Sequence, residues 1–332
     1  MKLSWILALF FVAMLIAMPA RFAIAEDGST EADAEAAESD AKSDEENDSE
    51  GTEAKDDSEN PAEGGSAKKK AAPAAAVPQE SYSEYLEKKE SARRRHLIET
   101  WSKHPHFRNV NGVYYLEFES AKPKCKGHAF FFPDTLGMPS MVPLANIASS
   151  AGFDAFIFLP MSDLSGTFPG MEEGQSQAGE EFKATAAAAL GTIGNHKKAN
   201  VIIAGGATGG YLLELIAQTG ENVPNGFALV NGFYANDDAN DLLAASISEF
   251  EGAVGDFSSA RNNSWLASAM SKRVFLLNKK GLPPVFRRIV IEPDNEMFQK
   301  DFATWLAKTD FVALKKAAKK LFAEIKKRKN AE

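Results

Sequence analysis

Apolar residues gather into short runs along the second half of the chain, and stretches with helical spacing separate these runs. An alternating apolar and polar pattern over residues 112–119 predicts a half-exposed strand. Continuous apolar runs predict buried strands over residues 128–132, 153–159, 200–204, 227–230 and 288–291, with a weaker strand over 250–254. Helices are predicted over residues 81–95, 139–151, 179–195, 211–218, 241–247, 263–272 and 296–307. Buried strands that alternate with helices favour an α/β fold with a mostly parallel sheet covered on both faces.

The first 25 residues have a different pattern. An apolar run over residues 3–20 follows a basic start, and Ala23-x-Ala25 matches the small-residue pattern before a signal-peptidase cut. We interpret the chain as bacterial and expect a cleaved Sec-type signal peptide over residues 1–25, with the mature protein in the periplasm. The run is close to the roughly 20 residues that span a bilayer, so retention as an anchor stays open. Cys125 is the single cysteine, which excludes an internal disulfide.

Residues 26–80 are of low complexity. Between residues 26 and 63 there are 17 acidic and two basic side chains, whereas the whole chain has a net charge of only −9. With few large apolar residues, this stretch cannot offset the roughly 1–2 kcal/mol per residue that backbone ordering costs. We therefore predict a disordered acidic linker over residues 26–80 and one folded domain over 81–310. This composition excludes a collagen-like chain, a disulfide-rich miniprotein and a multi-span membrane protein.

The last 22 residues, 311–332, contain eight basic and two acidic side chains. Their apolar residues recur with helical spacing: Phe311, Leu314, Leu321, Phe322 and Ile325. This pattern predicts a basic amphipathic helix. Either the helix contacts an anionic surface, or its apolar stripe packs on the sheet while its lysines stay in water. We do not expect nucleic acid as a partner.

Residues 205–210 read Gly-Gly-Ala-Thr-Gly-Gly, between a predicted buried strand and a predicted helix. Hydrolytic enzymes of the α/β class place their nucleophile in such a turn, in the pattern G-x-S-x-G, where glycines leave room for a strained backbone. We assign Ala207 to the nucleophile position, where it has no group that can attack. A register shifted by one residue would place Thr208 there. A phosphate cradle is a third interpretation, but the spacing of G-x-G-x-x-G and the lysine of a P-loop are missing.

The other members of a catalytic triad are incomplete. The chain order in this class is nucleophile, acid, histidine, and all five histidines precede the end of the glycine-rich turn: His96, His104, His106, His128 and His196. Asp256 is a candidate acid, and Asp294 or Asn295 stands where the histidine would be. The backbone after strand 128–132 could bind an anion. We expect no metal and no cofactor, and the candidate ligand-binding residues are Asp134, Gly206, Ala207 and Thr208.

Residues 126–308 resemble the bacterial domain-of-unknown-function 3530 family, a divergent branch of the α/β-hydrolase superfamily. The resemblance rests on residues 127–137, 205–210, 229–233 and 289–306. It implies an exported protein with an α/β-hydrolase-like fold and no established reaction. Because the nucleophile and the final histidine depart from the working pattern, we lean against an enzyme and expect a catalytically degenerate binding or accessory module with a small-molecule ligand. The alternatives are an atypical, esterase-like hydrolase that uses Thr208, and an envelope or polyanion adapter that acts through the Lys-rich tail.

Overall fold

The computed structural model describes residues 81–170, 177–193, 198–219, 224–258, 264–279, 287–291 and 295–330. All of them belong to Pro73–Glu332, one of the two units into which the chain divides. The predicted signal peptide (residues 1–25), the acidic linker (26–80) and Asp294 lie outside the described residues.

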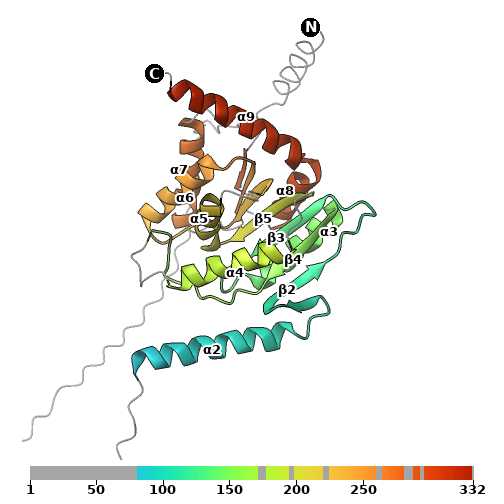
Figure 1. Cartoon of the computed structure of the whole chain (residues 1–332), viewed down its shortest axis with the longest axis vertical. Coiled ribbons are helices and arrows are strands. Elements are labelled where there is room, and N and C mark those ends of the chain that lie inside the picture. Colours follow the sequence, from blue (N-terminus) through green and yellow to red (C-terminus); the bar gives the residue numbers. More distant parts are fainter. Residues whose placement is uncertain are drawn as a thin grey trace, which may run out of the picture. The chain divides into compact units, whose positions relative to one another are not determined.

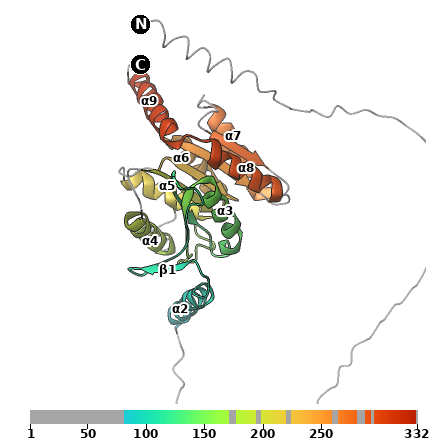
Figure 2. The same cartoon turned by 90° about the vertical axis from the view of Figure 1, so that its right-hand side faces the viewer.

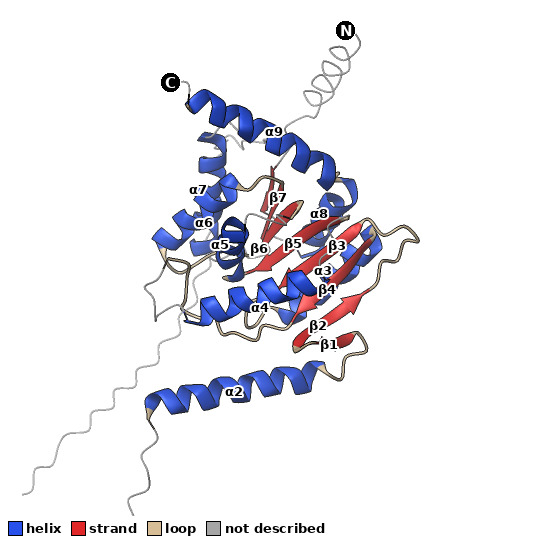
Figure 3. Cartoon of the chain, in the orientation of Figure 1, coloured by secondary structure: helices blue, strands red, loops and turns tan. Residues whose placement is uncertain are grey.

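The described strands form one sheet (Figures 1 and 3). They are β1 (Phe107–Val110), β2 (Val113–Phe118), β3 (Gly127–Phe132), β4 (Phe153–Phe158), β5 (Ala199–Gly205), β6 (Gly226–Val230), β7 (Ala253–Ser258) and β8 (Arg287–Ile291). The described helices are α2 (Tyr82–Trp101), α3 (Met138–Ala151), α4 (Gln177–Ile193), α5 (Thr208–Thr219), α6 (Asp237–Glu249), α7 (Ser264–Lys279), α8 (Asn295–Lys308) and α9 (Phe311–Lys329).

The strand order is β1-β2-β4-β3-β5-β6-β7-β8. The pairs β1–β2 and β2–β4 are antiparallel, and every later pair from β3 to β8 is parallel. This order, with one reversed strand beside a parallel block, is the arrangement of an α/β-hydrolase-like sheet. It confirms the fold class that the sequence predicted.

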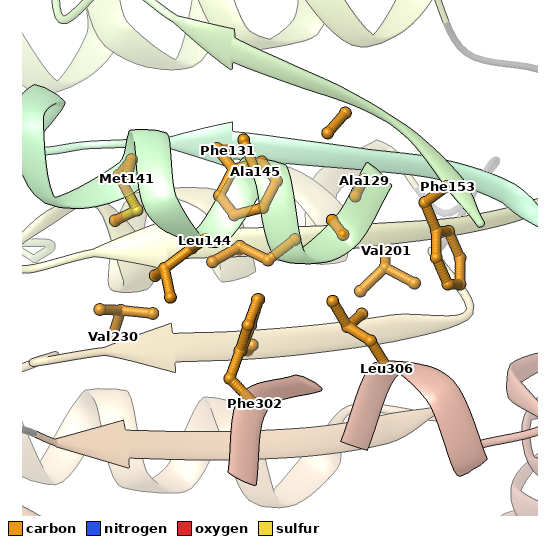
Figure 4. Close-up of a cluster of buried hydrophobic side chains, with 14 of the residues drawn as sticks. Ala129, Phe131, Met141, Leu144, Ala145, Phe153, Val201, Val230, Phe302 and Leu306 are labelled. Carbon is orange, nitrogen blue, oxygen red and sulfur yellow. The ribbon is translucent and has the colours of Figure 1, made fainter. Parts of the chain in front are cut away.

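Helices cover both faces of the sheet, as Figure 2 shows. On one face, α3 and α8 pack together over strand residues such as Phe131, Val201 and Val230 (Figure 4). On the other face, α4, α5 and α6 bury a second cluster that includes Phe130, Ile202 and Phe227. Because the strands β3, β5 and β6 are buried on both faces, their sequences are apolar at consecutive positions rather than at alternate ones.

Helices α2 and α7 end at Trp101 and Lys279, later than the predicted ends at 95 and 272, and three other elements differ from the sequence prediction as well. The edge strand β1 was not predicted, because three of its four residues are exposed and carry no apolar pattern. Helix α6 begins earlier than predicted because Asn236 caps it and accepts from the Ala239 N–H at 2.8 Å. Strand β7 lies at Ala253–Ser258 rather than at 250–254, because Phe250 ends α6 as its C-cap.

Helix α9 is anchored at its start. Phe311 is 3% exposed, and its ring lies edge-on to the rings of Trp305 and Phe153, with centroids 5.1 and 5.9 Å apart. Farther along, Lys316, Lys319 and Lys320 are exposed, whereas Ala318 on the same helix is buried. Among the described residues, no helix is both long enough and apolar enough to cross a membrane.

Candidate functional site

The turn between β5 and α5 consists of Gly206 and Ala207. Gly206 has φ 53°, and its N–H donates to the Val230 carbonyl at 3.0 Å. Positive φ is strained for residues with a Cβ, and among the described non-glycine residues it occurs only at Asn111 and Asn231. The residue of the turn with positive φ is therefore Gly206, one residue before Ala207, so this point of the turn carries no side chain.

The space above Gly206 is filled by a side chain from the connection that follows another strand, β3. A Cβ built on Gly206 would overlap the carboxylate of Asp134, which lies in the connection from β3 to α3. That connection runs against the turn, since a Cβ on Gly205 would come within 3.3 Å of the Pro133 Cα. The Asp134 carboxylate thus occupies the position where a side chain at the point of the turn would project.

Asp134 is only partly exposed, and its environment shifts its titration. Burial raises the pKa of the Asp134 carboxyl, and hydrogen bonds from the backbone N–H groups of Leu136 and Gly137 lower it in part. Gly137 is the N-cap of α3 and supplies no side-chain hydrogen bond of its own. Asp134 therefore places a carboxyl group at the start of α3, where the helix dipole favours negative charge.

Thr208 is the first residue of α5 and is 1% exposed. Its hydroxyl lies 2.9 Å from both the Phe132 carbonyl and the Gly205 carbonyl, which are its acceptors. A buried hydroxyl shared between two carbonyls links β3 to the β5–α5 turn. The hydroxyl proton of Thr208 is thus already donated to backbone carbonyls.

A cavity of about 300 Å³ opens beside the turn. It is lined by Asp134, Thr135, Leu136, Leu164, Ser165, Gly166, Thr167, Phe168, Gly206, Ala207, Phe233, Tyr234 and Ala235. Three of the four candidate ligand-binding residues thus meet at one cavity. The fourth, Thr208, is not among the residues that line it.

Tyr234 closes one side of the turn, and the sequence analysis did not single it out. Its hydroxyl donates to the Ala207 carbonyl at 2.7 Å and accepts from the Gly210 N–H at 3.1 Å. Burial raises the pKa of the Tyr234 phenol, so it stays neutral. A Cβ on Gly210 would overlap the Tyr234 hydroxyl, which explains why that position is glycine. The glycine was visible in the sequence, but nothing pointed to its partner 24 residues away.

Asp163 fixes the outer wall of the cavity. Its carboxylate accepts from the Thr135 hydroxyl and from the Ser165 N–H, each at 3.0 Å. Burial alone would raise the pKa of Asp163, but the hydrogen bonds from Ser165 and Thr135 leave it lowered. An ionised carboxylate therefore joins the loops that follow β3 and β4.

Asp256 lies elsewhere. It is 1% exposed and forms a two-point ion pair with the fully buried Arg273 of α7, with Nε donating to Oδ2 and Nη2 to Oδ1. The Arg273 Nη1 also donates to the Gly232 carbonyl at 2.9 Å. Burial raises the pKa of Asp256, and the charge and hydrogen bonds of Arg273 oppose that rise. Asp256 is not among the cavity-lining residues, and its carboxylate ties α7 to the sheet.

None of the described histidines, His96, His104, His106 and His128, lines the cavity, and His196 lies outside the described residues. His128 pairs with Asn200 in the amino half of β3, where burial lowers its pKa, and its Nε2 lies 3.8 Å from Asp154 Oδ2. His104 and His106 precede β1, and Asn295 is the first residue of α8. Where residues are described, no cluster of three or more His, Cys, Asp or Glu side chains could hold a metal ion.

No family model and no curated protein matches the chain. The sheet is similar to those of several solved structures at low identity. A predicted CIB-like hydrolase from Thermoplasma acidophilum is 13% identical and has a TM-score of 0.41, over 61% of this chain and 97% of that one. A carboxylesterase from Bacillus subtilis is 8% identical, with a TM-score of 0.42, over 67% and 98% of the two chains. A sugar hydrolase from Lactococcus lactis is 13% identical, with a TM-score of 0.42, over 60% and 96%.

Proposed function

We propose that this α/β-hydrolase-like protein binds a small molecule in the cavity beside the β5–α5 turn and does not hydrolyse it. One observation carries the proposal: the point of the turn is Gly206, and the Asp134 carboxylate fills the space of the missing side chain. Covalent hydrolysis by this fold needs a nucleophile at that point and a base to activate it. A cavity that keeps its walls without these groups is suited to binding.

An atypical hydrolase that uses Thr208 is the rival function. It has less support, because the Thr208 hydroxyl is buried and is already bonded to two backbone carbonyls. To attack a substrate, it would have to leave both acceptors and reach a cavity that it does not line.

A ligand screen by NMR, repeated on two matched variants, tests the binding function. Ala207→Leu places extra volume in the cavity, whereas Ala267→Leu adds the same volume at an exposed position of α7 that is not among the lining residues of the cavity. We expect small-molecule hits that Ala207→Leu abolishes and Ala267→Leu retains. Hits that persist in Ala207→Leu, or no hits at all, would contradict the proposal.

A panel of chromogenic esters, thioesters and amides tests the absence of hydrolysis. We expect no turnover by the unaltered chain. Turnover that disappears in Thr208→Val would establish the rival function, and turnover that survives this substitution would show another catalytic route. Either result would overturn the non-catalytic proposal.

We also propose that the chain belongs with the domain-of-unknown-function 3530 family and is exported to the periplasm. The motifs over residues 127–137 and 205–210 support the first proposal, and the leader-like pattern over residues 1–25 supports the second. Mass spectrometry of the protein from a bacterial periplasmic extract tests export, with Glu26 expected as the first residue. An intact leader in the membrane fraction would indicate an anchor instead.

The exposed basic side of α9 supports a second candidate function, contact with an anionic membrane surface. Lys316, Lys319 and Lys320 are exposed, as are Lys326, Lys327 and Arg328. Phe311 is buried in the core, so the start of the helix is held while the rest presents its charges to solvent. Lysines on a partly apolar helix are attracted to anionic lipid.

Vesicle co-sedimentation tests this contact. Deletion of all of α9 would remove the buried Phe311, so the better variant changes exposed residues only: Lys316→Gln, Lys319→Gln and Lys320→Gln together. We expect the unaltered chain to sediment with phosphatidylglycerol vesicles and not with phosphatidylcholine vesicles, and the triple variant to lose most of this binding. Equal binding by the triple variant would rule out this surface.

A further inference from the structure

The described lining of the cavity beside the β5–α5 turn contains an acidic side chain and no basic one. Among its described lining residues, Asp134 is the single Asp, Glu, Lys, Arg or His. Tyr234 also lines it, but its hydroxyl is held by the Ala207 carbonyl and the Gly210 N–H. An anionic ligand would therefore meet a carboxylate without any cationic side chain to balance it. Such a pairing is unfavourable in a partly buried site.

The donors that a hydrolase would offer to an anion are also in use. The Gly137 N–H donates to the Asp134 backbone carbonyl at 3.1 Å, and the N–H groups of Leu136 and Gly137 lie close enough to the Asp134 carboxyl to lower its pKa in part. A ligand anion would have to displace this carboxylate, and the displaced group would remain beside it. The turn thus holds an anion of its own, supplied by the β3–α3 connection.

The remaining walls suit an organic cation. Phe168, Phe233 and Tyr234 are the aromatic residues of the lining, and the buried Leu164 adds apolar surface. Aromatic faces attract ammonium groups, most strongly where water is excluded. A carboxylate beside aromatic rings is the combination that recognises substituted amines, and a cavity of about 300 Å³ limits the ligand to a small molecule.

We infer that the cavity selects small organic ammonium compounds, with the Asp134 carboxylate as the counter-charge and Phe168, Phe233 and Tyr234 as the surrounding walls. This inference rests on the proposed binding function and adds the chemical class of the ligand. Asp134 thus occupies the place of a nucleophile and serves as a recognition group.

Three probes of nearly equal shape test the inference: choline, its neutral carbon analogue dimethylbutanol, and the anion dimethylbutanoate. Their binding to the unaltered chain is measured by NMR titration. We expect choline to bind at least about tenfold more tightly than dimethylbutanol, and dimethylbutanoate to bind more weakly than both. This ranking needs no variant, so it does not depend on how a substitution affects folding.

Two charge-removing variants locate the effect. Asp134→Asn keeps the shape of the side chain and should remove the preference for choline, so that choline and dimethylbutanol bind alike. Glu119→Gln removes the same charge at an exposed position beyond β2, outside the cavity lining, and should leave the preference unchanged. A preference that survives Asp134→Asn would overturn the role of Asp134.

The possible outcomes distinguish the preference for cations from the proposed function of binding small molecules in the cavity. If dimethylbutanol or dimethylbutanoate binds as tightly as choline and Ala207→Leu abolishes that binding, the cavity binds ligands but does not select cations. If no probe binds while the ligand screen finds other cavity ligands, the cation inference is wrong and the binding function stands. If neither experiment finds a cavity ligand, both are wrong.

Discussion

Asp134 and Asp256 are both acids near the carboxyl ends of parallel strands, and the fold uses them in different ways. Asp256 is 1% exposed, and both of its oxygens bond to the guanidinium of Arg273. Asp134 remains partly exposed at a cavity, beside the backbone N–H groups of Leu136 and Gly137, and the described cavity lining contains no cationic side chain. A carboxylate paired with an internal cation has its charge neutralised by the protein itself. A carboxylate held only by backbone dipoles keeps its net charge for a ligand.

Removing the internal cation should give the largest effect. Arg273→Met leaves the Asp256 carboxylate buried without a partner, and we expect unfolding to become easier by about 3–5 kcal/mol, measured by urea denaturation. The double variant Arg273→Met with Asp256→Leu should recover most of this loss, because it removes both charges. Lys272→Met is the neighbouring control, since Lys272 pairs with Asp237 and Asp241 at the surface and should hardly matter. An equal loss of stability for Arg273→Met and Lys272→Met would show that the buried Asp256–Arg273 pair has no special structural role.

The next effect concerns the space that Asp134 shares with the turn. Gly206→Ala should destabilise the protein by about 1–3 kcal/mol from the positive φ, with a further cost from overlap with the Asp134 carboxylate. In Asp134→Ala the overlap is gone, so the cost of Gly206→Ala should fall to the backbone contribution. A double-mutant cycle by chemical denaturation measures the difference. Strict additivity would mean that Asp134 does not occupy this space.

The smallest effect is the pH dependence that Asp134 contributes. Its folded pKa is raised above the ordinary value of 3.8, so the folded chain binds more protons than the unfolded chain between these two values. Stability from this group is therefore lost as the pH rises from 3.8 through the folded pKa. Relative to Asp134→Asn, which does not titrate, the unaltered chain should lose stability over this window and change no further above it. The opposite slope in paired denaturation curves would show a lowered pKa.

Much of the fold could be predicted from local patterns. Strands β3, β5 and β6 are buried on both faces, so each can be recognised in the sequence by its consecutive apolar residues. Strand β7 was misplaced because its sequence contains Gly255 and Asp256, which are rare in buried strands, and because the apolar Phe250 ends a helix instead. The long-range pairing of Asp256 with Arg273 explains the acid in the strand, and no local pattern reveals such a pair.

Three of the candidate ligand-binding residues, Asp134, Gly206 and Ala207, line one cavity, whereas Thr208 does not. The sequence alone did not indicate which residue of the glycine-rich turn takes the positive φ, which the structure places at Gly206. Asp134 was a candidate ligand-binding residue because it follows β3, yet its approach to Gly206 depends on the packing of two non-consecutive connections. Tyr234 was missed for the same reason. Sequence patterns indicate where strands end, whereas contacts between different loops require the folded chain.

The shared space of Gly206 and Asp134 also bears on how this chain can evolve. A serine at position 206 would collide with the aspartate, and loss of the aspartate alone would leave a hole above Gly206. Each single step is thus disfavoured, and only the paired change is sterically consistent. Two neighbouring positions that exclude each other's side chains therefore constrain which substitutions can be accepted first. We therefore expect natural variation at 134 and 206 to be correlated, with a small residue at one position accompanying a larger residue at the other.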